Sequence, residues 1–230
     1  MLRRKIAIAD IHGCSRTFKR MLFERLHVAR EDILYLLGDY IDRGPDSQGV
    51  LDTILALRDD GFDIRPLMGN HEAMLLQALE AVSGEHLHFW MDNGGRATLK
   101  SYGVQHPDEL PSEHIRFMRS LPLHLHTATH IFVHAGLNFC LEEPFSHEGE
   151  QAMLWDRYQH SDRVKQQGKV LVVGHTVTNE EDIRRSLKSR VIRLDNGCYM
   201  GGRIAGLGCL AALELETGQL HLEGNCEGAY

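Results

Sequence analysis

The stretch Leu36-Leu37-Gly38-Asp39-Tyr40-Ile41-Asp42-Arg43-Gly44 decides how the rest of the chain is interpreted. An apolar run ends at a glycine, and two carboxylates and an arginine follow it at once. A plain turn after a buried strand needs only one Asp or Asn and one Gly. A site that holds a divalent metal beside a phosphate group uses a carboxylate ligand, a second acid and a guanidinium fork. The alternative for this stretch alone is a surface loop with a solvated ion pair, because short motifs recur by chance.

The composition is that of an ordinary globular chain with an acidic balance. The 230 residues are 43% hydrophobic and 25% charged, with a net charge of −7, so the chain can bury a core of its own. It has no basic footprint for nucleic acid and no polybasic cluster for an anionic membrane. Five scattered cysteines without a C-x-x-C pair argue against a disulfide framework and favour a reducing compartment.

The apolar runs are also too short for targeting or membrane insertion. Residues 6–9 cannot form the core of a signal peptide, and no run approaches the roughly 20 residues of a membrane span. We therefore expect a cytoplasmic protein with no membrane and no nucleic-acid partner, and we expect a monomer.

Apolar runs and helical patterns alternate in the first part of the chain. Runs at residues 5–9, 32–37 and 62–68 predict buried strands, and the segments between them predict amphipathic helices, one of which is capped by Asp46. This alternation favours βαβ units and a parallel sheet. Further strands are predicted at residues 123–127, 131–134, 170–173, 191–194, 210–215 and 220–222, the last two as a hairpin. No linker divides the chain, so we predict one α/β domain over residues 1–230.

Four more stretches share the organisation of the first. Each follows an apolar run and pairs a metal-capable side chain with a glycine: Asp10-Ile11-His12-Gly13, Gly69-Asn70-His71-Glu72, Val133-His134-Ala135-Gly136 and Gly174-His175. Loops beyond the carboxyl ends of strands converge in an open α/β sheet. Asp, His and Asn ligands suit Mn, Fe or Zn, and two such ions about 3.5–4 Å apart are the usual arrangement for hydrolysing phosphate esters. Six candidate ligands suffice for two ions: Asp10, His12, Asp39, Asn70, His134 and His175.

Taken in order, these motifs resemble the phosphoprotein phosphatase family of calcineurin-like metallophosphoesterases. Within that family they are similar to the small bacterial and phage enzymes of the lambda phosphatase type. The resemblance covers residues 10–175 and implies an α/β fold with a central mixed β-sandwich flanked by helices. It also implies a metal-dependent enzyme that hydrolyses phosphoproteins or small phosphomonoesters, phospho-Ser and phospho-Thr first and phospho-Tyr as an extension. Its cofactors would be two divalent ions, with Mn²⁺ first and Fe or Zn as alternatives.

The resemblance further implies a role for each metal-capable residue. Asp10 and His12 would hold one metal with Asp39, and Asp39 would bridge to the second metal. The remaining ligands of the second metal would be Asn70, His134 and His175. A hydroxide that bridges the two metals would attack phosphorus in line with the ester oxygen, without a covalent enzyme intermediate.

The same resemblance assigns the catalytic side chains. His71, supported by Asp42, would protonate the leaving oxygen, which suits an imidazole oriented by a carboxylate. Arg43 would bind the phosphoryl oxygens, and Arg157, in Trp155-Asp156-Arg157, matches the second arginine of the family.

Two other functions stay open. Dinucleoside tetraphosphate (Ap4A-type) hydrolases resemble this family closely, but they tend to lack the first Asp of Asp-Arg-Gly and to read Gly-Asn-His-Asp. The presence of Asp42 and Glu72 favours the monoester phosphatase. The other function is a metal-binding scaffold without catalysis. Such a scaffold is expected to have lost one of the metal ligands, or His71, or Arg43, and all of these residues are present.

The sequence departs from the family at Ala9, at Val133-His134-Ala135-Gly136 and near Asp195-Asn196-Gly197, where the long aromatic loop of the eukaryotic relatives is absent. We therefore do not expect the toxin sensitivity or regulatory partners of those relatives. Nine further histidines, His114 among them, are interpreted as surface or edge residues. Cys14 is interpreted as a small apolar residue.

Overall fold

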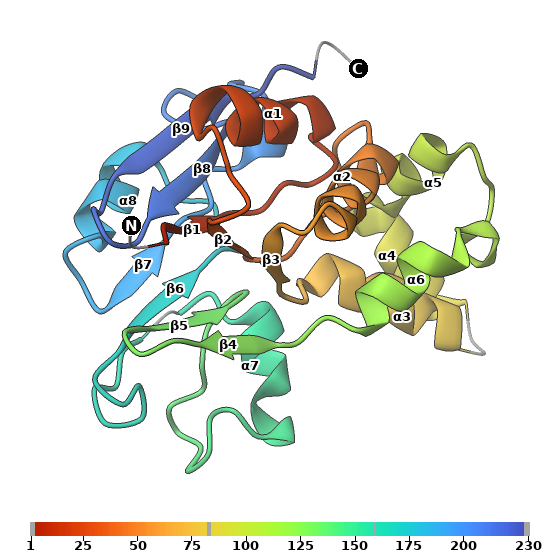
Figure 1. The fold of residues 1–230 in the computed structure, drawn as a ribbon. Helices are drawn as coiled ribbons and strands as arrows, with labels where there is room; N and C mark the ends of the chain where they lie inside the picture. The colour runs from red at the N-terminus through yellow and green to blue at the C-terminus, as the bar shows by residue number, and fades with distance from the viewer. Residues whose placement is uncertain (1–2, 82–83, 159, 228–230) are drawn as a thin grey trace.

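Two β-sheets pack against each other in this computed structural model, which describes residues 3–81, 84–158 and 160–227 (Figure 1). The first sheet has the order β3-β2-β1-β8-β9 and the second has the order β4-β5-β6-β7. In the first sheet, β1 to β3 run parallel, whereas β8 and β9 are antiparallel. In the second sheet, β4 is antiparallel to β5, and β5 to β7 run parallel.

The strands of the first sheet are β1 (Lys5–Ile8), β2 (Ile33–Leu36), β3 (Asp63–Pro66), β8 (Cys209–Glu214) and β9 (Leu220–Gly224). Those of the second sheet are β4 (His124–His126), β5 (His130–Val133), β6 (Val170–Val173) and β7 (Val191–Arg193). Each predicted strand is present, with ends that differ by at most two residues.

Apolar side chains of both sheets form a shared core. Ala7, Tyr35 and Ala211 of the first sheet pack with Phe132 and Val172 of the second. The rings of Tyr35 and Phe132 are stacked, with centroids 4.2 Å apart. Burial of these faces removes apolar surface from water and holds the two sheets together. The predicted α/β fold with a mixed β-sandwich and flanking helices is confirmed.

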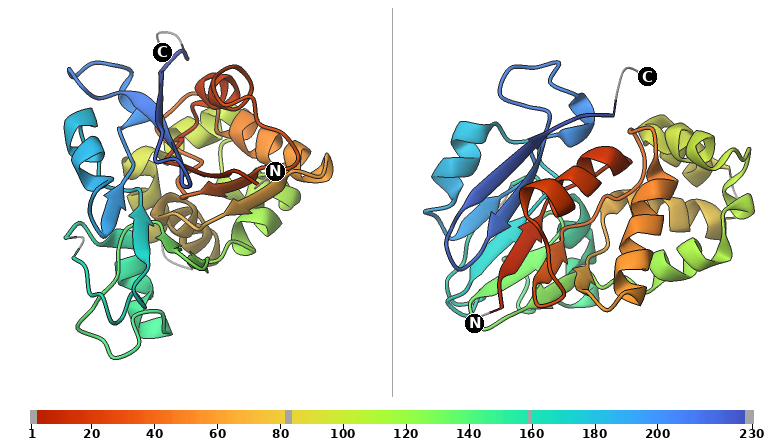
Figure 2. Two further views of the ribbon diagram at one scale, coloured as in Figure 1. Left: turned by 60° about the vertical axis from the view of Figure 1, so that its left-hand side comes forward. Right: turned by 45° about the horizontal axis from the view of Figure 1, so that its top comes forward.

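Helices surround this core. They are α1 (Ser15–Arg20), α2 (Ser47–Asp59), α3 (Asn70–Glu80), α4 (Glu85–Trp90), α5 (Arg96–Tyr102), α6 (Ser112–Arg119), α7 (Glu150–Trp155) and α8 (Glu180–Ser186). Figure 1 shows α2 to α6 gathered at one side of the molecule and α8 at the other side, beside β7. Figure 2 shows the hairpin of β8 and β9 next to α1. Wide turns of π-helix extend α1 over Met21–Arg25 and join α4 to α5 over Met91–Gly95.

Several local predictions can be compared with the structure. Asp46 caps α2 as predicted, because its carboxylate accepts the backbone N–H of Gly49 at 2.9 Å. The prediction that Asn70 and His71 lie in a loop is wrong, since both form the first turn of α3. In the described part of the chain, no helix is long and apolar enough to cross a bilayer.

His114 is not the surface residue that the sequence predicted. It lies on α6 with 4% of its surface exposed. Its Nδ1 is 2.6 Å from the Tyr102 hydroxyl and its Nε2 is 3.1 Å from a carboxylate oxygen of Asp52. These polar partners compensate for burial between α2, α5 and α6, which a single-sequence pattern does not reveal.

Candidate metal centre

The predicted ligands lie just beyond the carboxyl ends of strands from both sheets. Asp10 follows β1, Asp39 follows β2 and Asn70 follows β3, all in the first sheet. His134 follows β5 and His175 follows β6 in the second sheet. All of these side chains are buried. The site therefore lies where the ends of the two sheets meet, as expected for ligands in parallel α/β sheets.

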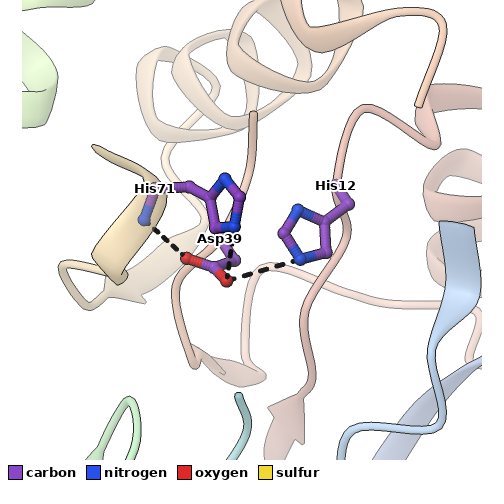
Figure 3. Close-up of side chains that lie close together, drawn as sticks. All are labelled: His12, Asp39 and His71. Atoms are coloured by element: carbon purple, nitrogen blue, oxygen red, sulfur yellow. Dashed lines mark hydrogen bonds and ion pairs between the residues drawn. The ribbon is translucent and has the colours of Figure 1, made fainter. Parts of the chain in front are cut away.

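Asp39 is at the centre of the cluster. Its Oδ2 lies 3.4 Å from His12 Nε2, 4.0 Å from His71 Nε2 and 3.5 Å from His134 Nε2. Figure 3 shows the carboxylate between the rings of His12 and His71. Two groups with the spacing of metal ligands share this residue: one joins Asp39 with His12 and His71, and the other joins it with His134 and His175. One carboxylate thus faces two candidate metal positions.

Backbone carbonyls determine which ring nitrogen carries the hydrogen in two of the histidines. His12 Nδ1 is 3.0 Å from the Ile41 carbonyl oxygen, and His134 Nδ1 is 2.8 Å from the Leu37 carbonyl oxygen. A carbonyl oxygen can only accept, so each Nδ1 carries the hydrogen. The neutral rings therefore keep their lone pairs on Nε2, which faces the site. This is the tautomer that metal ligation requires.

Some acceptor atoms of this cluster face one another or have no hydrogen-bond partner. The Nε2 lone pair of His134 faces Asn70 Oδ1 at 2.9 Å and Asp39 Oδ2 at 3.5 Å. The buried atoms Asp10 Oδ1 and His175 Nε2 have no hydrogen-bond partner. Buried acceptors of this kind call for a bound ion or water, and a divalent cation satisfies nitrogen and oxygen donors together. The residues present therefore fit metal ions.

Asp10 and Asn70 are tied to the second group through His175. The Oδ2 atom of Asp10 accepts the backbone N–H of His175 at 2.9 Å, and Asn70 Oδ1 lies 2.9 Å from its Nδ1. Both predicted ligands thus lie within the cluster, and both are buried.

The electrostatics of the site favour neutral imidazoles beside an ionised carboxylate. Burial lowers the pKa of His12 and of His134, and burial together with the charges of His134 and Arg157 lowers the pKa of His175 to about 3. For Asp39, burial acts to raise the pKa, but the neighbouring histidines outweigh it and lower the pKa. Metal ligands must be deprotonated, so these shifts match what a metal needs.

Asp10, Asp39 and Asp195 are three buried carboxyl groups that influence one another's pKa. Burial and the charges of Asp195 and Asp39 raise the pKa of Asp10 well above its ordinary value. Burial raises the pKa of Asp195 to about 6. Like charges this close favour a bound cation, which relieves their repulsion.

His71 and Asp42 form a buried pair. His71 Nδ1 lies 2.7 Å from Asp42 Oδ2, and its buried Nε2 has no hydrogen-bond partner and faces the site. Burial opposes a charge on His71, but the carboxylates of Asp39 and Asp42 outweigh it and raise the pKa of the imidazole. Asp42 also accepts hydrogen bonds from Trp90 Nε1 at 2.9 Å and Thr98 Oγ1 at 2.6 Å. The carboxylate is thereby fixed toward His71.

The two predicted phosphate-binding arginines differ in their surroundings. Arg43 is half-buried, donates from Nη1 to His12 Nε2 at 2.9 Å and lies over the ring of Tyr199 at 4.6 Å. Arg157 is exposed and acts on the site through its charge, since it contributes to the lowered pKa of His175. All predicted site residues except Arg157 are joined by direct contacts.

Backbone strain gathers at this site. Among the described residues other than glycine, positive φ angles occur at His27 and Gln167 and at the site residues His12, Asp39, Asp42, Arg43 and His175. Side chains disfavour this region, and such residues persist only where the surroundings hold them. Strain of this kind is typical of functional sites.

Sequence reasoning missed the structural role of Glu72 and did not identify three further residues that shape the site. Glu72 is buried and accepts backbone N–H groups from residues 39, 40, 41 and 69 at 2.8–3.3 Å, so it fixes the loop that carries Asp39. Its place three residues after Gly69, at the start of a helix, was a signal for a capping role. Trp90, Thr98 and Tyr199 left no such signal, because their contacts join segments far apart in the chain.

The chain belongs to the calcineurin-like phosphoesterase family, whose model matches residues 4–200. It is similar to a symmetrical bis(5'-nucleosyl)-tetraphosphatase of Acidovorax sp. (strain JS42), with 33% identity over 65% of this chain and 51% of that protein. The chain thus spans about half the length of that relative. It is also similar to serine/threonine-protein phosphatase 1 of Salmonella typhimurium (strain LT2), with 27% identity over 86% of this chain and 88% of that protein.

Solved structures support the same fold. A candidate diadenosine tetraphosphatase has a TM-score of 0.63 and 20% identity, with coverage of 99% of this chain and 96% of that chain. The cold-active protein-tyrosine phosphatase of a psychrophilic Shewanella sp. has a TM-score of 0.61 and 18% identity, with coverage of 97% and 81%. The solved structures thus show the fold of calcineurin-like phosphoesterases, to which the family model also assigns the chain, and the finer resemblance to the lambda phosphatase type stays a prediction.

Proposed function

We propose that this metallophosphoesterase hydrolyses phosphomonoesters whose leaving group is an alkoxide, as in phosphoserine and phosphothreonine of proteins. The observation that carries this proposal is the buried pair of His71 and Asp42, with 2.7 Å between Nδ1 and Oδ2. An alkoxide is a poor leaving group and needs a proton, which an imidazole oriented by a carboxylate can donate from its other nitrogen. A phosphate leaving group is far less basic and gains little from such a pair.

Two divalent ions, Mn²⁺ first, would be held by Asp10, His12, Asn70, His134 and His175 around the shared carboxylate of Asp39. When bound, such ions supply Lewis acidity toward the phosphoryl oxygens and an activated water at neutral pH. The tautomers of His12 and His134, which the backbone fixes, support this assignment.

The arginines would bind the phosphoryl group. Arg43 lies beside His12 with its guanidinium carbon over the ring of Tyr199, and a planar fork suits the equatorial oxygens of a phosphoryl group. Arg157 would approach from the exposed side and act as the second such group. Both would stabilise charge that spreads over the oxygens as the ester bond breaks.

Hydrolysis of dinucleoside tetraphosphates is the second candidate, and the relatives support it more strongly than the first. The tetraphosphatase of Acidovorax matches at 33% identity, against 27% for the protein phosphatase of Salmonella. A pocket of about 630 Å³ beside the site also favours it. Trp155, Phe139 and Tyr158 line this pocket, and the ring centroid of Trp155 is 6.3 Å from that of His175. Aromatic walls of this kind suit a nucleobase.

A substrate panel with Mn²⁺ separates the two candidates. It would compare phosphoserine, phosphothreonine and phosphotyrosine peptides with diadenosine tetraphosphate and a simple diester. Turnover of the phosphopeptides without turnover of diadenosine tetraphosphate is expected from the first candidate. The reverse result would overturn it and support the second, in which case Tyr158→Ala should raise KM for the dinucleotide.

The same panel tests whether the protein is a catalyst at all. Chelated protein should regain turnover of p-nitrophenyl phosphate when Mn²⁺ is added. If folded protein binds Mn²⁺ and still shows no turnover of any substrate, the chain is a metal-binding scaffold instead.

A further inference from the structure

The segment of residues 90–98 closes over the strained turn of Asp42 and Arg43. It consists of the last residue of α4, the wide turn Met91–Gly95 and the start of α5. We refer to it as the 90–98 clasp. The clasp comes after β3 and α3 in the chain, and it is not one of the five sequence stretches that carry the predicted ligands.

Two side chains of the clasp bind both carboxylate oxygens of Asp42. The indole N–H of Trp90 donates to Oδ2 at 2.9 Å, and the hydroxyl of Thr98 donates to Oδ1 at 2.6 Å. Thr98 Oγ1 also accepts the backbone N–H of Asp42 at 2.9 Å, so this hydroxyl binds both the backbone and the side chain of Asp42. Trp90 and Thr98 are both buried, which makes these hydrogen bonds strong and excludes water as a substitute.

The glycines of the clasp allow this close approach. Gly94 has a φ of +115°, its carbonyl accepts the backbone N–H of Arg43 at 3.4 Å, and a Cβ there would lie 2.9 Å from Arg43 Cγ. A Cβ on Gly95 would lie 2.4 Å from the indole ring of Trp90. The paired glycines therefore let the backbone pass over Arg43 while the indole reaches Asp42.

The turn beneath the clasp needs such support. Asp42 and Arg43 have φ angles of +70° and +67°, a conformation that these side chains adopt only when their surroundings impose it. One oxygen of Asp42 is shared between Trp90 Nε1 and His71 Nδ1, so the indole fixes the orientation in which the carboxylate meets the imidazole.

We propose that Trp90 and Thr98 are positioning residues for catalysis: they hold Asp42 in the orientation that directs the proton of His71 toward the leaving oxygen. This inference rests on the proposed roles of Asp42 and His71. The clasp would then serve the chemical step, and it would contribute little to metal binding or to substrate affinity.

Two conservative variants remove the donors and keep the packing. Trp90→Phe retains a ring against Gly95, and Thr98→Val keeps the shape of the side chain. Each should lower kcat for glycerol 2-phosphate by about tenfold, with KM and Mn²⁺ content unchanged. The loss should be smaller for p-nitrophenyl phosphate, whose leaving group needs less protonation.

Matched controls separate positioning from packing. Thr98→Ser keeps the hydroxyl and should restore the activity that Thr98→Val loses. Thr53→Val removes a buried hydroxyl that donates to the Gly49 carbonyl in α2, away from the site, and should behave as the unaltered protein does. Folded variants that retain full kcat for glycerol 2-phosphate, or that lose equally on both esters, would overturn the proposal.

A measurement without turnover tests the contact itself. The chain has two tryptophans, so metal-free protein labelled with ¹⁵N should give two indole signals, and Trp90→Phe assigns them. Asp42→Asn should shift the Trp90 signal and leave that of Trp155 in place. An unmoved Trp90 signal would overturn the inference. If the unaltered protein hydrolyses neither ester, the proposed function fails, and the indole signals still decide whether the clasp binds Asp42.

Discussion

Asp39 presents one carboxylate oxygen to the imidazoles of His12, His71 and His134. Asp39→Asn should therefore weaken binding of both metal ions, whereas Asp10→Asn should weaken one. Calorimetric titration with Mn²⁺ checks this through the number and affinity of the sites. Retention of one site at full affinity in Asp39→Asn would contradict the bridging role.

His71 is close enough to the cluster to be a ligand, since its Nε2 is 4.0 Å from Asp39 Oδ2, and its role needs a separate test. We expect His71→Asn to keep its Mn²⁺ content and to lose about 10²–10⁴-fold in kcat, most for alkyl esters. Metal analysis and kinetics on the same preparation check this. If His71→Asn loses a metal ion, then His71 is a ligand and the proposed general acid must lie elsewhere.

The sequence could predict which polar side chains lie together, because each candidate ligand belongs to a short motif that follows an apolar run; their roles stay predictions. Asp10, His12, Asn70 and His134 were placed at strand ends from neighbouring letters alone, and the structure brings them together. What surrounds them was not predictable in the same way. The indole of Trp90 reaches Asp42 from a distant segment, and the positive φ angles depend on the folded backbone.

Helix α3 supports the site through a residue that contacts neither metal position directly. Glu72, in its first turn, accepts backbone N–H groups from the loop of residues 39–41. Burial raises the pKa of Glu72, yet both of its oxygens serve as acceptors. An amide in its place would turn an NH₂ group toward backbone donors.

We therefore expect Glu72→Gln to lower the free energy of unfolding by about 2–3 kcal/mol, the cost of an unpaired buried group. Urea unfolding of metal-free protein measures this. Glu80→Gln, at the exposed end of the same helix, is the control and should change little. Equal stability of the two variants would show that Glu72 does not hold the loop.

A strong apolar pattern made some elements easier to predict than others. Strands β2 and β6 are continuous apolar runs, whereas Ile183 is the one buried apolar residue of α8, and charged pairs cover the rest of that helix. Its start is marked by Asn179, whose side chain accepts the Asp182 N–H, a signal that the apolar pattern does not contain.

The metal centre also links the two halves of the sandwich. Asp10 and Asp39 extend from the first sheet, and His134 and His175 extend from the second. Metal ions bound between them should stabilise the native state, because the unfolded chain does not hold these ligands together.

Chelation should consequently lower the melting temperature of the whole molecule, and added Mn²⁺ should raise it in proportion to the logarithm of its concentration. Scanning calorimetry at several Mn²⁺ concentrations checks this. A melting temperature that does not depend on Mn²⁺ would mean that the ligands bind no metal in the folded state.

The position of β1 between β2 and β8 has a consequence for how the chain is made. On the ribosome, β1 can pair with β2 early, but its other edge waits until residues 209–214 emerge, since Ile6 pairs with Glu214. Until then an apolar edge stands open to any extended neighbour. Every predicted ligand has been synthesised by residue 175, so the nascent chain already contains its candidate site while this edge is still exposed, and pairing of β8 with β1 is the step that removes the risk of aggregation.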